Sequence, residues 1–205
     1  MTAAPLEATR GPAPRLDALP PEHTSGKWGM SLAILTEALL FLSLFFAYFY
    51  VRALHEDWLS QPPPKLALAF TLLVILLVSS GTVELSRHAL ERERAVAARA
   101  WLAGTIALGV LFVLVQLREY RERLEHLRPT TNAYGSLFYA ITTFHALHVL
   151  VGLAMLVFVL ALPRLRGAHA PKRPLENAAL YWHFVDGVWI CVVGLLYVLP
   201  RLGAR

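Results

Sequence analysis

The chain has 205 residues, of which 57% are hydrophobic and only 16% are charged, and its formal net charge is +5. A soluble domain carries about a quarter charged residues, so this composition excludes an ordinary soluble enzyme. A secreted disulfide scaffold is also excluded, because the chain has a single cysteine. The basic residues lie between apolar stretches, where membrane proteins normally keep them, so no nucleic-acid binding is expected.

The first 27 residues are predicted to form a mobile N-terminal tail. They contain five prolines and no apolar run long enough for the core of a signal peptide. Their apolar surface is too small to offset the entropy lost on ordering. We therefore expect the folded part of the chain to comprise residues 28–205.

Five apolar stretches follow this tail. A membrane span needs about 20 predominantly apolar residues to cross the hydrocarbon core, and each stretch has that length. Together they contain only three of the 14 acidic residues. The connections are too short for an extramembrane domain, so an all-α bundle of five transmembrane helices is predicted. The spans are expected at about 30–51, 66–86, 97–117, 135–162 and 180–200.

The polar segments between the spans predict helix ends and orientation. Residues 87–99 and 118–128 alternate in charge, which is typical of solvated helix ends, and we expect them to prolong the second and third helices. One side of the membrane would carry eleven Lys and Arg residues and the other eight. By the positive-inside rule, the N-terminus is predicted to lie inside and the C-terminus outside.

Three acidic side chains lie within the predicted spans: Glu37, Glu84 and Asp186. An ionisable group in a span costs at least about 2.5–3.5 kcal/mol on insertion scales, so each is a functional candidate. Glu84 is close to Arg87 and is predicted to be a charge at a helix end. With the predicted orientation, all three lie with His183 in the inner half of the bilayer. Such a cluster indicates a protonation site, a polar network or lipid-headgroup contacts. For Glu37 and Asp186, a structural bond between helices is the open alternative.

The histidines give two further hypotheses. His145 and His148 project from one helical face, with Gly152 further along it. They could ligate a metal or haem, or make polar contacts within the bundle or with a partner subunit. At about 1.5 Å rise per residue, His148 and His183 differ in depth by roughly 15 Å, so no metal site joining them is predicted. His183 and Asp186 are three residues apart, and we expect them to pair.

Five segments, taken in their order along the chain, resemble subunit III of the haem–copper respiratory oxidases. The most characteristic segment of that family usually reads Tyr-Trp-His-Phe-Val-Asp-Val-Val-Trp. The matching segments are WGMSLAILTEALLF at 28–41, SSGTVELSRHAL at 79–90, LGVLFVLVQLREY at 108–120, YGSLFYAITTFHALHVLVG at 134–152 and YWHFVDGVW at 181–189.

The resemblance implies a bundle without a redox cofactor of its own, in the bacterial cytoplasmic (inner) membrane. It would dock on the catalytic subunit I, which holds the haems and copper, beside other oxidase subunits. It would support proton uptake and the stability of that subunit. Glu37 matches the family's buried carboxylate, and family members bind structural phospholipid beside that helix, where Trp28 also lies. The other polar residues within the matching segments are His145, His148, His183, Asp186 and Glu119.

Two departures and three alternatives accompany this resemblance. The longer form of the family has two additional N-terminal helices without counterpart here, and Gly187 replaces the usual Val, which we expect to allow closer helix packing. Similar five-helix proteins occur in quinol oxidases and as accessory proteins of nitric oxide reductase, although Glu37 favours cytochrome c as electron donor. The chain could instead be a small membrane cytochrome that ligates haem through His145 and His148. A proton-coupled transporter centred on Glu37 is disfavoured by the lack of repeats.

Overall fold

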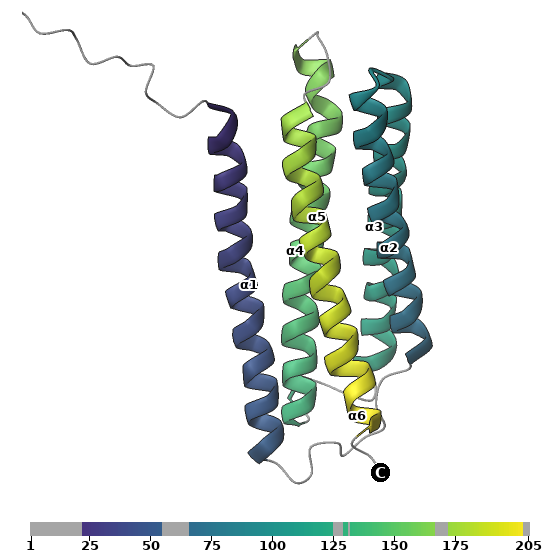
Figure 1. Cartoon of the computed structure of the whole chain (residues 1–205). Coiled ribbons are helices and arrows are strands. Elements are labelled where there is room, and N and C mark those ends of the chain that lie inside the picture. Colours follow the sequence, from purple (N-terminus) through teal and green to yellow (C-terminus); the bar gives the residue numbers. More distant parts are fainter. Residues whose placement is uncertain (1–21, 55–65, 125–128, 131, 167–171, 203–205) are drawn as a thin grey trace, which may run out of the picture.

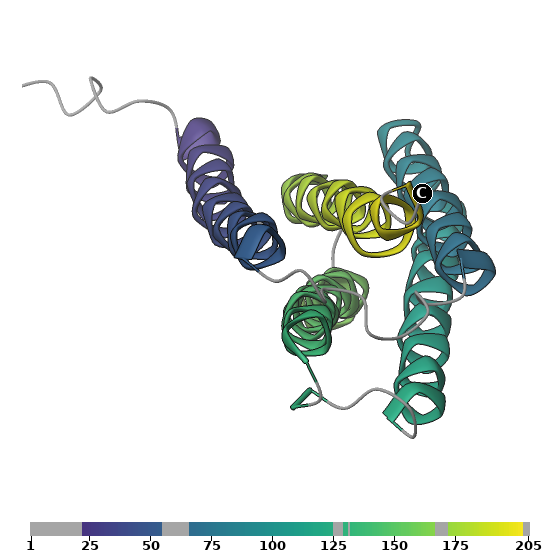
Figure 2. The ribbon, with the colours of Figure 1, turned by 90° about the horizontal axis from the view of Figure 1, so that it is seen from below.

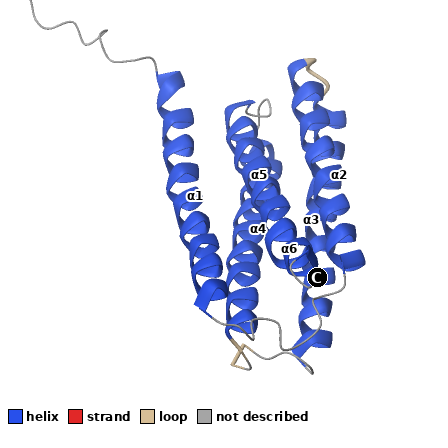
Figure 3. Ribbon diagram, turned by 60° about the horizontal axis from the view of Figure 1, so that its bottom comes forward, coloured by secondary structure: helices blue, strands red, loops and turns tan. Residues whose placement is uncertain are grey.

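The computed structural model describes residues 22–54, 66–124, 129–130, 132–166 and 172–202. Every regular element in this part of the chain is a helix (Figure 3). Five long helices form the bundle, and the fifth continues through a short π-helix, η2, into α6. Their bounds are Glu22–Leu54 for α1, Leu66–Glu91 for α2, Ala95–Leu124 for α3, Ala133–Arg166 for α4, Lys172–Val192 for α5, Val193–Val198 for η2 and Leu199–Leu202 for α6.

The helices run side by side, with α5 at the centre of the contacts. α5 packs against α1, α2 and α4, whereas α3 packs against α2 and α4. α2 and α3 form an antiparallel hairpin on one side of the bundle, and α1 stands on the other side (Figure 1). The view along the bundle shows α1 set apart from that hairpin by α4 and α5 (Figure 2). Only two described side chains of α1, Phe41 and Tyr48, are buried.

The predicted all-α class and the bundle of five long apolar helices are confirmed. Each predicted stretch lies inside one of five helices that are long and apolar enough to cross a membrane. Spanning structures satisfy their backbone hydrogen bonds within the segment, which explains why each helix continues past its apolar core. The helices extend beyond the predicted bounds: α1 includes residues 22–27, which were assigned to the tail, and α5 begins eight residues before position 180. Residues 1–21 lie outside the described part of the chain.

The connection between α2 and α3 differs from the expected helical extension. α2 ends at Glu91 and α3 begins at Ala95, because Glu93 adopts a left-handed backbone conformation with φ 59°. The Arg94 amide then donates to the Ala89 carbonyl and the Glu93 amide to the Leu90 carbonyl, the two bonds of a Schellman cap. The same alternation of charge is expected for two helices joined by a tight turn and for one long solvated helix, so the charge pattern alone could not predict the turn. For the other predicted extension, helix is described as far as Leu124.

A proline shapes the end of the fifth helix. Pro200 has no N–H, so the Leu196 carbonyl lacks its usual α-helical donor. The hydroxyl of Tyr134, on α4, donates to this carbonyl at 2.8 Å. The π-helix ends at Val198, two residues before Pro200, and the amide of its C-cap residue Leu199 donates to the Gly194 carbonyl. This side-chain bond therefore ties the start of α4 to the altered register at the end of α5.

Replacing Tyr134 with Phe should lower the free energy of unfolding by about 1–3 kcal/mol, because the Leu196 carbonyl would then be buried without that donor. The measurement is heat-induced unfolding of the full chain in detergent. Tyr50→Phe is the matched control, because Tyr50 is exposed on α1 and should tolerate loss of its hydroxyl. Equal unfolding temperatures for the two variants would contradict the assigned role of the Tyr134 hydroxyl.

Candidate functional site

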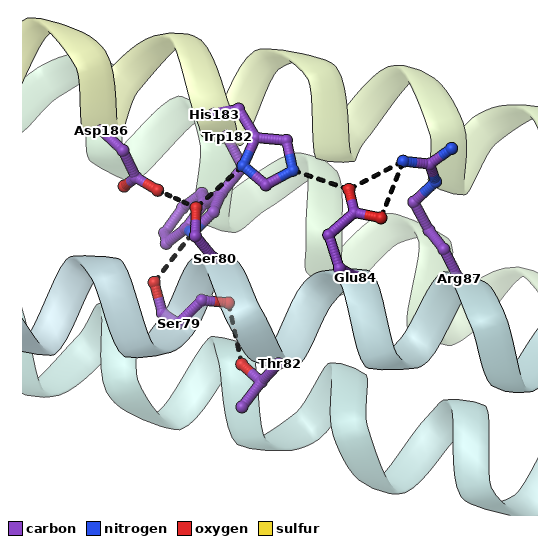
Figure 4. A network of polar contacts seen from close by, with 8 residues as sticks. All are labelled: Ser79, Ser80, Thr82, Glu84, Arg87, Trp182, His183 and Asp186. Carbon is purple, nitrogen blue, oxygen red and sulfur yellow. Dashed lines mark hydrogen bonds and ion pairs between the residues drawn. The ribbon is translucent and has the colours of Figure 1, made fainter.

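A continuous chain of polar contacts crosses the interface between α2 and α5 (Figure 4). The Arg87 Nη1 atom donates to the two Glu84 carboxylate oxygens at 2.7 and 2.9 Å. Glu84 Oε1 lies 2.7 Å from His183 Nε2, and His183 Nδ1 lies 2.8 Å from the Ser80 hydroxyl oxygen. That hydroxyl also contacts Asp186 Oδ2. The chain thus joins a side chain near the end of α2 to a carboxyl group inside the bundle.

Helical spacing explains this alignment. Ser80, Glu84 and Arg87 recur at intervals of four and three residues on α2, so they share one face, and His183 and Asp186 do the same on α5. Exposure falls along the chain: the side chains of Glu84 and His183 are each 36% exposed, whereas Asp186 is 4% exposed. Asp186 Oδ1 is buried and has no hydrogen-bond partner among the described residues.

The predicted direct pair of His183 and Asp186 is wrong, because Ser80 stands between them. The interpretation of Glu84 as an end charge is incomplete: its contact with Arg87 is present, but it also bonds His183 on another helix. Sequence reasoning did not single out Ser80. The available signal was a pair of serines, at 79 and 80, within an otherwise apolar span.

Trp182 fixes the position of α5 beside this polar chain. Its side chain is fully buried, and its indole N–H donates to the Ser79 hydroxyl at 2.9 Å. Its ring lies against two glycines on different helices. A Cβ atom added at Gly109 on α3 would be 2.8 Å from Trp182 Cη2, and one added at Gly152 on α4 would be 2.8 Å from Trp182 Cε3. Three helices therefore approach closely around one aromatic ring.

Glu37 makes its contact elsewhere, between α1 and α4. Its Oε2 atom lies 2.8 Å from His148 Nε2, and His148 Nδ1 lies 2.6 Å from the Phe144 carbonyl oxygen. The side chain of Glu37 is 37% exposed and that of His148 is 12% exposed. The Phe41 ring packs edge-on against His148, at 4.9 Å between centroids. The predicted cluster therefore forms only in part: Glu84, His183 and Asp186 meet, whereas Glu37 pairs with His148.

His145 has different surroundings from His148, although both lie on α4. Its side chain is 1% exposed and stacks on Trp189, with ring centroids 4.8 Å apart, and Phe112 packs edge-on at 5.8 Å. Neither ring nitrogen of His145 has a hydrogen-bond partner among the described residues, whereas both nitrogens of His148 are engaged. In this part of the chain, no three His, Cys, Asp or Glu side chains are grouped so that they could hold a metal ion.

The two remaining residues singled out from the sequence lie away from these contacts. Glu119, 3% exposed, accepts from Arg123 Nη2 at 2.6 Å, and the Tyr197 hydroxyl approaches it at 3.3 Å. The Arg123 guanidinium also lies over the Phe138 ring, 4.7 Å from its centroid. Trp28, near the start of α1, is exposed. Glu119 thus belongs to a buried structural ion pair, whereas Trp28 lies on the surface of the bundle.

Comparison with known proteins shows the family of the chain. Residues 22–200 match the family described as Cytochrome c oxidase subunit III. A Thermostichus vulcanus protein named cytochrome c oxidase subunit 3 is 32% identical over 84% of this chain and 87% of its own length. The protein of that name from Synechocystis sp. is 35% identical over 84% of this chain and 75% of its own length. A Mycobacterium bovis protein named probable cytochrome c oxidase subunit 3 is 36% identical, covering 80% and 83% of the two chains. The chain therefore belongs to the cytochrome c oxidase subunit III family.

Proposed function

We propose that this protein acts as subunit III of a haem–copper terminal oxidase that takes electrons from cytochrome c. It would dock on catalytic subunit I, which holds the haems and copper, and would carry no redox centre itself. The family match over residues 22–200 supports this role. The cited relatives bear the cytochrome c oxidase name, which favours cytochrome c over quinol or nitric oxide chemistry.

The proposed setting is the bacterial cytoplasmic membrane, with the N-terminus inside. The distribution of Lys and Arg between the connections supports that orientation. The exposed apolar surface of α1, which includes Trp28, supports a contact with structural phospholipid. Identification of the proteins in the native complex tests the assignment: we expect a haem–copper subunit together with a partner that has a copper-binding domain. Co-purification with a quinol-oxidising complex would contradict it.

Within this assembly we propose that Glu37 and His148 hold a proton that supports proton uptake by the catalytic subunit. The Phe144 carbonyl can only accept, so the hydrogen of that contact belongs to His148 Nδ1. The contact between His148 Nε2 and Glu37 Oε2, at 2.8 Å, then needs one more hydrogen. It is carried either by an imidazolium facing a carboxylate or by a carboxylic acid facing a neutral ring. This contact between two ionisable groups is the observation that carries the proposed proton role.

Replacing Glu37 with Gln should leave assembly intact but shorten the period of sustained oxidase turnover several-fold. The glutamine amide can still donate to His148 Nε2, so the link between α1 and α4 persists, but the amide cannot exchange a proton. The measurement is oxygen consumption by the purified complex, followed until activity is lost. Glu122→Gln is the control, because the Glu122 side chain is 60% exposed and pairs with Arg118 on the same helix.

Two results would contradict the proton role of Glu37. If the Glu37→Gln complex fails to assemble, the residue is a structural bond between helices. If assembly and sustained turnover both match those of the wild type, the residue does not support proton uptake.

A further inference from the structure

The contacts around Glu84 determine where the first hydrogen of the polar chain lies. A guanidinium has only donors, so both Glu84 oxygens accept from Arg87, at 2.7 and 2.9 Å. Glu84 Oε1 also lies 2.7 Å from His183 Nε2. With the carboxylate accepting from Arg87, the hydrogen between Oε1 and Nε2 is assigned to the histidine. His183 therefore donates from Nε2, and its Nδ1 atom faces Ser80.

The contacts around Ser80 require a further proton. Its hydroxyl has one hydrogen, but it contacts both His183 Nδ1, at 2.8 Å, and Asp186 Oδ2. If His183 were neutral and Asp186 ionised, both neighbours would be acceptors and only one could be satisfied. The other contact would bring two lone pairs together, and the four ionisable groups would carry a net negative charge inside a membrane bundle. Burial of an unpaired charge or acceptor is costly.

One added proton satisfies every contact in either of two arrangements. In the first, His183 is an imidazolium that donates to Ser80, and Ser80 donates to the Asp186 carboxylate. In the second, Asp186 is a carboxylic acid that donates to Ser80, and Ser80 donates to neutral His183. Both arrangements leave Arg87, Glu84, His183 and Asp186 electrically neutral as a group. The same heavy-atom positions therefore accommodate both.

We propose that Ser80, His183 and Asp186 form a proton-binding site in which one proton is shared between the histidine and the aspartate through the serine hydroxyl. In the step from histidine to aspartate, the His183 Nδ1–H bond breaks and a new Ser80 O–H bond forms. The original Ser80 O–H bond breaks at the same time, and its hydrogen bonds to Asp186 Oδ2. No net charge enters or leaves the site, and no other reactant is needed.

The two ends of the proton-binding site differ in burial. The histidine end is 36% exposed and the aspartate end 4% exposed, so the proton moves between a partly exposed group and a buried one. Asp186 Oδ1, buried without a partner among the described residues, is the atom at which a further donor or acceptor would continue the path. A hydrogen-bonded chain of this kind polarises along its length.

Other ionisable groups on the packed helices do not complete the chain. Within the described residues, none of them hydrogen-bonds to Ser80, His183 or Asp186 apart from Glu84, which Arg87 contacts. The groups concerned have contacts of their own: Glu37 with His148, His145 with Trp189, and Glu119 with Arg123. The site is therefore separate from Glu37, and the inference does not rest on the role proposed for that residue.

The test measures the proton at both ends in the purified complex. Asp186 is followed through the infrared carbonyl band of its acid form, with ¹³C-labelled aspartate. His183 is followed through the ¹⁵N resonances of its imidazole. Both are recorded over a range of temperatures at one pH. We expect the acid band of Asp186 and the imidazolium signal of His183 to change in opposite directions, because one proton is divided between them. Asp186→Asn should abolish the acid band, and Glu37→Gln should leave it unchanged.

Variants at position 80 test the path. Ser80→Thr keeps a hydroxyl and should preserve the opposed changes, whereas Ser80→Ala should abolish them. If Ser80→Ala does not fold, Asp186→Asn tests whether His183 and Asp186 share the proton: without the carboxylate, a charged His183 would leave the group with a net positive charge, so its imidazolium signal should be lost. Three results would overturn the proposal: a neutral His183 beside an ionised Asp186 in the wild type, independent changes at the two ends, or unchanged coupling in Ser80→Ala. Each can be distinguished from a failure of the Glu37 experiment, which measures turnover.

Discussion

The full chain carrying Gly152→Ala should unfold at a lower temperature than the wild type, with a loss of about 1–3 kcal/mol in the free energy of unfolding. The added methyl group would lie 2.8 Å from Trp182 Cε3 and 3.0 Å from Cζ3, which is too close for carbon atoms. The ring cannot move away easily, because it also lies against Gly109 and its N–H bonds Ser79. Inserting carbon into such a packed core forces backbone shifts of this cost. The measurement is heat-induced unfolding in detergent.

A second glycine gives a control with the opposite expectation. Nothing lies within 4 Å of a Cβ atom added at Gly81, which is also inside a helix. Gly81→Ala should therefore leave stability unchanged or raise it by up to about 1 kcal/mol, because alanine is the better helix former. Gly109→Ala should behave like Gly152→Ala. If the three glycine-to-alanine variants changed the free energy of unfolding equally, helix propensity rather than the fit around Trp182 would decide stability.

Replacing Arg123 with Met should destabilise the chain by about 3–5 kcal/mol. Glu119 is 3% exposed and its carboxylate accepts from Arg123 at 2.6 Å, so the substitution leaves a buried charge without its ion-pair partner. Breaking a buried pair from one side costs this much because the remaining charge has lost its compensation. Unfolding of the full chain in detergent gives the value.

Two comparisons separate charge from packing at this pair. The double variant Arg123→Met with Glu119→Gln should recover most of the lost stability, since no buried charge remains. Arg118→Met removes the cation of a pair with the same spacing on the same helix, but its side chains are 81% and 60% exposed. Its effect should stay within about 0.5 kcal/mol. An equal loss of stability in Arg118→Met and Arg123→Met would contradict the prediction that burial of the Glu119–Arg123 pair sets the cost of breaking it.

The spans could be predicted from the sequence because each is marked by its own run of apolar residues, independently of the other helices. A run of about 20 apolar residues must cross the membrane as a helix whatever its neighbours are. The end of α2 could not be predicted in this way, because Glu93 takes a backbone conformation that favours glycine. The expectation that Gly187 allows closer helix packing was wrong. Nothing lies within 4 Å of a Cβ atom added there, so this glycine allows no close approach among the described residues, whereas Gly109 and Gly152 do.

The candidate site was predictable residue by residue but not contact by contact. Glu37, His148, His183 and Asp186 stood out because each is an ionisable side chain in an apolar run. Their partners depend on which helix faces which and at what height, and a single sequence does not contain this information. Ser80 illustrates the limit: a serine is unremarkable in a span until two ionisable groups from another helix converge on it.

The sparse packing of α1 has a consequence for the order of biogenesis. Of the described helices α1 is synthesised before the others, but its main contacts are with α4 and α5, which are synthesised after α2 and α3. It must therefore remain in the bilayer without these two partners until they are inserted. The apolar side chains that cover its exposed faces suit that interval, because lipid solvates them as well as protein does. Docking of α1, through Phe41, Tyr48 and the bond from Glu37 to His148, is then a late step of assembly.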